Sequence, residues 1–128
     1  MITEKIYQEY IKILQEELIP AMGCTEPIAV AYCAALAGKA LGSQPEKVIV
    51  KASPNIIKNV KSVVVPNTGG QRGIAAAAAA GIITGNPDAK LQVLADITPD
   101  QVKQLAEYLN HGEFLVEKSE KPYVFHIE

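Results

Sequence analysis

The stretch that decides the fold lies in the middle of the chain, where residues 67–85 read NTGGQRGIAAAAAAGIITG. Six consecutive alanines, Ala75–Ala80, predict a long helix over residues 71–83, because alanine has the highest helix propensity of all residues. Glycines open this helix, and GNPD at residues 85–88 ends it. Alanine side chains leave a thin helix, so we expect neighbouring elements to approach its backbone closely.

Four further helices are predicted around the alanine-rich one. Residues 3–19 repeat apolar side chains at helical spacing, which predicts an amphipathic helix capped by Thr3. Residues 27–41 carry small side chains on nearly all sides and a single charge, which favours an interior position. Two shorter helices follow, over residues 55–61 and 98–109. Each has a start signal made of a hydroxyl residue that can cap and a proline suited to the first turn, Ser53-Pro54 and Thr98-Pro99.

Alternating apolar and polar residues predict a few short strands. They cover residues 47–52, 92–96, 113–117 and 123–127. The sequence SEKP at residues 119–122 suggests a hairpin between the last two strands. The fold class is therefore α+β, with a helical first two-thirds and a small, mostly antiparallel sheet.

Length and composition exclude several classes of protein. The 128 residues suit one domain over residues 1–128, and the last predicted strand runs to the final residue, so we expect the front part of a longer protein. No apolar run reaches the ~20 residues of a membrane span, and no leader is visible. Two cysteines are too few for a disulfide scaffold. We therefore expect a protein of the reducing cytoplasm. A net charge of −2 argues against wholesale nucleic-acid binding.

The charges are unevenly distributed along this acidic chain. Residues 47–87 contain no aspartate or glutamate but five cations, namely Lys47, Lys51, Lys58, Lys61 and Arg72. Both flanking segments carry more acids than bases. The acid-free segment is therefore a candidate site for an anionic ligand, although scattered solvated lysines would give the same composition.

The first motif whose residues could take part in a reaction is GCTEP at residues 23–27. Proline is tolerated only in the first turn of a helix, so Cys24 is expected just outside a helix N-terminus. The partial positive charge there stabilises a thiolate, which could act as a nucleophile, a general base or a metal ligand. Cys33 lies two and a half helical turns further on, so the two sulfurs should point to opposite sides. We expect Cys33 to be a small buried hydrophobic residue.

Two more motifs carry polar residues in the acid-free segment. Residues 53–60 read SPNIIKNV, and helical spacing places Asn55, Lys58 and Asn59 on about one face, either as a polar pocket or as a solvated helix surface. Residues 65–70 read VPNTGG, where glycines permit close backbone approach and free N–H groups at a helix start can bind an anion. No Walker A loop or dinucleotide fingerprint is present, and neither histidine has metal-ligand spacing to a partner.

Together, GCTEP (23–27), SPNIIKNV (53–60) and VPNTGG (65–70) resemble the L-cysteine desulfidase family, which is related to the iron–sulfur L-serine dehydratases. The resemblance is strongest over residues 18–86. It implies α,β-elimination without pyridoxal phosphate, from L-cysteine to pyruvate, ammonia and sulfide or from L-serine to pyruvate and ammonia. It also implies a 4Fe–4S cluster that acts as a Lewis acid on the leaving group.

The resemblance assigns roles to particular residues. Cys24 would be the active-site cysteine, as the base that removes the Cα proton or as a cluster ligand. The other motif residues would line the substrate pocket and hold the substrate's carboxylate: Asn55, Lys58, Asn59, Asn67, Thr68, Gly69 and Gly70. Family members are much longer, and their cluster cysteines lie mainly in the C-terminal part. We therefore expect an N-terminal portion that needs the C-terminal portion of the same enzyme, or a homodimer, to hold the cluster.

Two other classes of function fit parts of the sequence. A non-catalytic domain that binds amino acids or small carboxylates would keep the pocket and lack the chemistry. The sequence GQRG at residues 70–73 also resembles the G-x-x-G loop of KH nucleic-acid domains, but the low pI of about 5.7 and the few aromatic residues count against that reading. Steep salt dependence of binding would separate nucleic-acid recognition from pocket binding.

Overall fold

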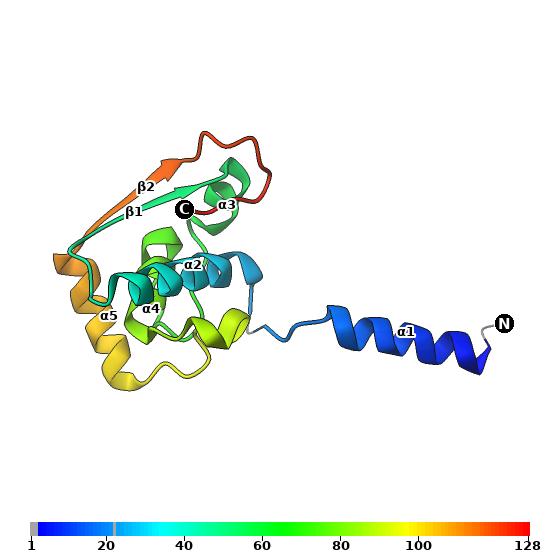
Figure 1. The fold of residues 1–128 in the computed structure, drawn as a ribbon. Helices are drawn as coiled ribbons and strands as arrows, with labels where there is room; N and C mark the ends of the chain where they lie inside the picture. The colour runs from blue at the N-terminus through cyan, green and yellow to red at the C-terminus, as the bar shows by residue number, and fades with distance from the viewer. Residues whose placement is uncertain (1–2, 22) are drawn as a thin grey trace.

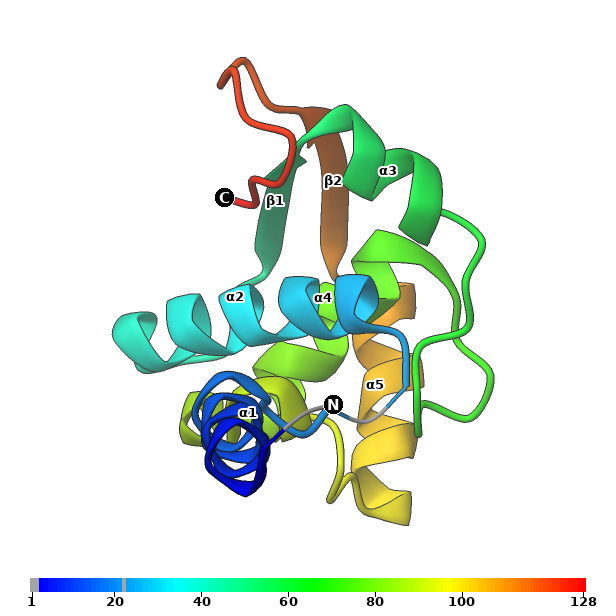
Figure 2. The ribbon, with the colours of Figure 1, turned by 90° about the vertical axis from the view of Figure 1, so that its right-hand side faces the viewer.

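The alanine-rich helix lies at the centre of the molecule (Figures 1 and 2). The computed structural model describes residues 3–21 and 23–128. The elements in chain order are α1 (Glu4–Glu17), α2 (Thr25–Leu41), β1 (Lys47–Ala52), α3 (Pro54–Val60), α4 (Gly73–Thr84), the 3-10 helix η1 (Pro87–Gln92), α5 (Pro99–His111) and β2 (Glu113–Lys118). The predicted α+β class and all five predicted helices are confirmed.

Helices α2 and α4 pack against each other at the centre of the hydrophobic core. Residues 76–81 of α4 are all buried, and α2 buries Ala31 and Ala35 towards the interior. At the crossing, Gly81 faces the backbone of Ala31 so closely that a Cβ on Gly81 would lie 2.7 Å from the Ala31 carbonyl carbon. The small side chains therefore allow the close helix approach that the sequence predicted.

Helix α5 packs against α4 and leads into β2. The Thr98 hydroxyl accepts from the Gln101 N–H, and the Gln101 side chain accepts from the Thr98 N–H, so a capping box starts the helix. At its other end, the buried Tyr108 donates its hydroxyl to the Pro45 carbonyl at 2.6 Å and packs edge-on against Phe114. These contacts fasten the end of α5 to the start of both strands.

The sheet differs from the predicted antiparallel arrangement. Strands β1 and β2 pair in parallel, from Lys47 opposite Glu113 to Ala52 opposite Lys118. Three α-helices and the 3-10 helix η1 lie between these strands and return the chain to the same end of the sheet, which is the crossover that parallel pairing requires. Alternating side chains reveal a strand but not its partner, so the sequence pattern could not distinguish the two orientations.

The predicted hairpin over residues 113–127 is also wrong. The last residues instead run antiparallel along the other edge of β1, where Lys51 and Glu128 exchange backbone hydrogen bonds of 2.8 and 2.7 Å. Residues 92–96, a predicted strand, are instead the last residue of η1 and the turns that follow it, and Val93 and Leu94 are both buried there. Two adjacent buried side chains do not alternate between faces, so packing of a turn rather than a strand explains this apolar run.

Helix α1 extends away from the rest of the molecule (Figure 1). Thr3 caps it as predicted, with the Ile6 N–H donating to the threonine hydroxyl at 3.3 Å. No residue of α1, all of which the structure describes, is buried. None of the helices within residues 3–21 and 23–128 combines the length and the apolar character needed to cross a bilayer.

Candidate functional site

The structure brings the first and third motifs into contact at the N-terminus of α2. Cys24 is the N-cap of α2 and is exposed, and its side chain makes no capping hydrogen bond. The preceding Gly23 has a φ of +78°, and a Cβ there would lie 3.0 Å from Cγ of Pro66. A glycine is therefore required where the cysteine loop passes the loop of residues 66–70.

A side-chain hydrogen bond joins the second motif to the first. The Asn59 amide on α3 donates to a carboxylate oxygen of Glu26 at 3.1 Å. Asn55 and Lys58 are exposed on the same short helix, one turn before Asn59 and next to it. The sequence analysis missed Glu26 as a site residue, although its place two residues after Cys24 was the available signal. The three motifs therefore meet around the start of α2.

Two predicted pocket residues of the third motif, Asn67 and Thr68, donate their side-chain hydrogen bonds to the backbone and so stabilise the loop. The buried Thr68 donates its hydroxyl to the Val65 carbonyl at 2.7 Å. The Asn67 amide donates to the carbonyl oxygens of Leu94 and Ala95, at 3.0 and 3.3 Å. These bonds fix the loop against the segment that follows η1, so both side chains contribute by shaping the loop.

The two glycines of this loop are exposed, as is Asn67. Gly69 and Gly70 have φ values of +71° and +94°, a conformation that favours glycine, and both are exposed. An antiparallel bridge between Val64 and Arg72 closes the base of the loop. Exposed backbone groups on a rigid loop suit the binding of a small carboxylate.

The cations of the acid-free segment do not form one patch. Lys47 pairs with Glu113 at 3.4 Å on the sheet, and Arg72 donates to the Ser62 carbonyl at 3.0 Å. Lys58 is the predicted pocket cation, and it is exposed on α3, next to Asn59 in sequence. At the start of α2 the structure therefore brings together the Cys24 thiol, the Glu26–Asn59 hydrogen bond and the close approach of Gly23 to Pro66.

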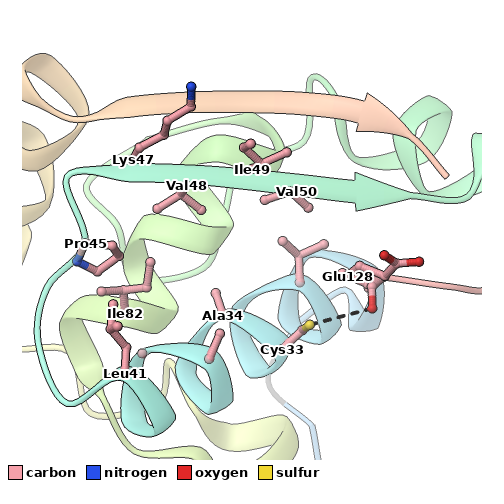
Figure 3. Close-up of a pocket in the computed structure, with 14 residues that line it drawn as sticks. Cys33, Ala34, Leu41, Pro45, Lys47, Val48, Ile49, Val50, Ile82 and Glu128 are labelled. Atoms are coloured by element: carbon pink, nitrogen blue, oxygen red, sulfur yellow. Dashed lines mark hydrogen bonds between the residues drawn. The ribbon is translucent and has the colours of Figure 1, made fainter.

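Cys33 lies in a different environment from Cys24. Its side chain is partly buried and lines an apolar cavity of about 250 Å³ between α2 and β1 (Figure 3). The thiol donates to the Ile127 carbonyl at 3.7 Å, and burial raises the pKa of Cys33. The prediction of a small buried residue thus holds in part. The walls of this cavity are mainly aliphatic, so it does not suit a charged amino acid.

The residues of this chain do not fit a 4Fe–4S cluster. Such a cluster takes three or four cysteine ligands, and the chain has only Cys24 and Cys33. Within the part of the chain that the structure describes, no three histidine, cysteine, aspartate or glutamate side chains gather into a metal site. Cys24 is exposed and could at most add one ligand to a set completed by another polypeptide.

The two thiols should differ in reactivity. Near neutral pH, we expect iodoacetamide to alkylate Cys24 at least about tenfold faster than Cys33, because the raised pKa of Cys33 lowers its thiolate fraction and burial limits access. A time course of peptide masses after quenching measures both rates in one sample. In urea the two rates should converge. Equal rates in the native protein would contradict the assigned environments.

The chain is similar to UPF0597 proteins of several bacteria. It is 51% identical to one from Desulfitobacterium hafniense over 124 residues, which are 97% of this chain and 29% of that protein. It is 49% identical to one from Treponema denticola over 94% of this chain and 28% of the relative, and 50% identical to one from Shewanella baltica over 89% and 27%. No protein-family model and no solved structure match the chain. It therefore resembles UPF0597 proteins over nearly its whole length and spans less than a third of theirs.

Proposed function

We propose that this chain is the N-terminal portion of a lyase that eliminates the β-substituent of L-cysteine or L-serine, with a 4Fe–4S cluster and without pyridoxal phosphate. One observation carries the proposal. The three motifs that resemble the L-cysteine desulfidase family lie up to 47 residues apart in sequence and meet around the start of α2. The cluster ligands would come from the remaining part of the enzyme.

The residues at this site suit the binding of a small amino acid. The Lys58 ammonium and the N–H groups of the Gly69–Gly70 loop are suited to a carboxylate, because charge-assisted hydrogen bonds are the strongest of their kind. The Glu26 carboxylate, already an acceptor for Asn59, is suited to the substrate's ammonium group. Together these groups would orient the Cα–H bond of the substrate.

Cys24 is the proposed base. Its side chain is exposed at the N-terminus of α2 and makes no capping hydrogen bond, so the sulfur is accessible to a bound substrate. The thiolate takes the Cα proton, the electron pair of that bond forms the Cα–Cβ double bond, and sulfide or hydroxide leaves Cβ with its own pair. The resulting enamine tautomerises to an imine, and water hydrolyses the imine to pyruvate and ammonia.

A chimera tests the proposal. This chain replaces the matching segment of the Desulfitobacterium protein, and iron and sulfide are added without oxygen. We expect the chimera and the intact Desulfitobacterium protein to release pyruvate from L-cysteine or L-serine, and the isolated chain to release none. If both long proteins fold, take up iron and still release no pyruvate from either amino acid, the proposal is wrong.

A second candidate is a domain that binds amino acids without chemistry. It is favoured by one observation: the predicted pocket residues belong to this chain, whereas a cluster ligand set does not. Calorimetric titration of the isolated chain with L-cysteine and L-serine tests this function. Binding that salt hardly changes, together with an inactive chimera, would favour the binding domain over the lyase.

Replacing Lys58 by alanine in the chimera should mainly weaken substrate binding. Loss of one charge-assisted hydrogen bond costs about 1.5–3 kcal/mol, so we expect KM to rise roughly 10- to 100-fold. Lys61→Ala is the matched control, because it removes the same charge from the end of the same helix. Steady-state pyruvate release measures both variants. An unchanged KM for Lys58→Ala would remove this lysine from the pocket.

A further inference from the structure

Helix α1 presents an apolar face that no other described residue of this chain buries. Five side chains recur along one side of the helix and are 45–55% exposed: Ile6, Tyr7, Tyr10, Ile13 and Leu14. Figures 1 and 2 show that α1 points away from the body, so this face is not turned towards the core. The opposite side carries mainly charged residues, with Lys12 near its middle.

Such a helix is not expected to be stable without a partner. Isolated helices shorter than about 12–15 residues are marginal in water, and α1 has 14 residues. In proteins, most helical stability comes from packing of the apolar face. A row of large exposed apolar side chains on one helix therefore indicates a binding surface.

The length of the UPF0597 relatives indicates which partner covers this face. The match to the Desulfitobacterium protein includes all but four residues of this chain, so most of α1 lies within it, while more than two-thirds of that relative lies outside it. A second copy of this chain is a poorer fit. Two helices about 21 Å long bury far less surface than the roughly 800 Å² per partner of a stable interface.

We propose that the apolar face of α1 docks into an apolar groove on the polypeptide that corresponds to the rest of the UPF0597 relatives. Helix α1 as a whole carries four glutamates and two lysines, so we expect basic residues at the rim of that groove. Recognition is then of the helix-in-groove type, with anchors spaced three and four residues apart.

Docking of α1 would also bring the candidate site near the partner polypeptide. Helix α1 ends at Glu17, and Cys24 follows seven residues later, so the helix and the thiol cannot lie far apart. With α1 bound, Cys24 lies at most about 25 Å from the end of the docked helix. This consequence rests on the proposed function, in which that polypeptide holds the cluster; the docking itself does not need the reaction.

The first test measures binding without turnover. The part of the Desulfitobacterium protein outside the match is purified as a separate polypeptide and titrated with this chain in a calorimeter. The double substitution Tyr10→Glu and Leu14→Glu should weaken binding at least ~100-fold, because two large apolar anchors are lost. Lys12→Glu on the charged side changes the net charge by the same amount and should leave Kd within about threefold.

A second measurement covers the case in which the separate polypeptide does not fold. In the chimera described above, hydrogen exchange of the α1 amides should be slow, and Tyr10→Glu with Leu14→Glu should make it fast. Equal binding by the double variant, or fast exchange of α1 in the unmodified chimera, would overturn the proposal. So would dimerisation of the isolated chain that the double variant abolishes, since a second copy would then be the occupant. The pyruvate assay is independent of these results, so the two proposals can fail separately.

Discussion

Replacing Gly81 by alanine is expected to destabilise the fold by at least ~3 kcal/mol, a large share of the roughly 5–15 kcal/mol available to a domain. A Cβ at this position would lie 2.7 and 2.8 Å from the carbonyl carbon and Cα of Ala31. The obstacle is the backbone of α2, so no side-chain rotation can relieve the overlap. Helices α2 and α4 would have to move apart, and their shared core would lose close packing.

Gly38→Ala is the matched control for this prediction. Gly38 lies in α2 and faces Ile82 of α4, where a Cβ would meet atoms 3.7–3.8 Å away, which is ordinary van der Waals contact. Because alanine is a better helix former, this change should be neutral or stabilising by up to about 1 kcal/mol. Urea unfolding followed by circular dichroism measures both variants. Similar unfolding midpoints for the two variants would contradict the close crossing.

The helical part of the fold was predictable because its signals are local. The alanines at 75–80 and the capping residues Thr3 and Thr98 each act within one helix, and the structure has helices at these places. The pairing of β1 with β2 was not predictable, because it depends on how the four intervening helices return the chain. Alternation at 47–52 and 113–117 is the same for either orientation.

The candidate site was predictable as a set of residues but not as an arrangement. Sequence placed Cys24 at a helix start, and the structure has it there. The hydrogen bond from Asn59 to Glu26 links positions 33 residues apart, and no local pattern encodes such a contact. From the sequence, the polar side chains of Thr68 and Asn67 were expected to bind a ligand. In the structure both donate hydrogen bonds to backbone carbonyls. A side-chain donor on a tight loop can bond to the loop's own backbone or to a ligand, and the residue type is the same in both cases.

Replacing Cys24 by alanine in the chimera should abolish pyruvate release, with a loss of at least ~10³-fold, because this thiol is the proposed base and Cys33 lines the cavity between α2 and β1 instead. The fold should be unaffected. Cys24 is exposed and its side chain makes no capping hydrogen bond, so we expect no change in Tm. Anaerobic steady-state assays and thermal unfolding of the same preparation measure the two effects.

Cys33→Ala should give the opposite pattern, which makes it the control for general thiol loss. Cys33 lines the apolar cavity between α2 and β1, so its truncation enlarges that cavity and should cost about 1 kcal/mol of stability. Its sulfur lies nine residues beyond Cys24 and is bonded to the Ile127 carbonyl, away from the meeting point of the three motifs. Turnover should therefore persist. Normal turnover by Cys24→Ala would exclude this thiol as the base, whereas loss of turnover in both variants would point to a role of the cysteines in iron binding rather than in proton removal.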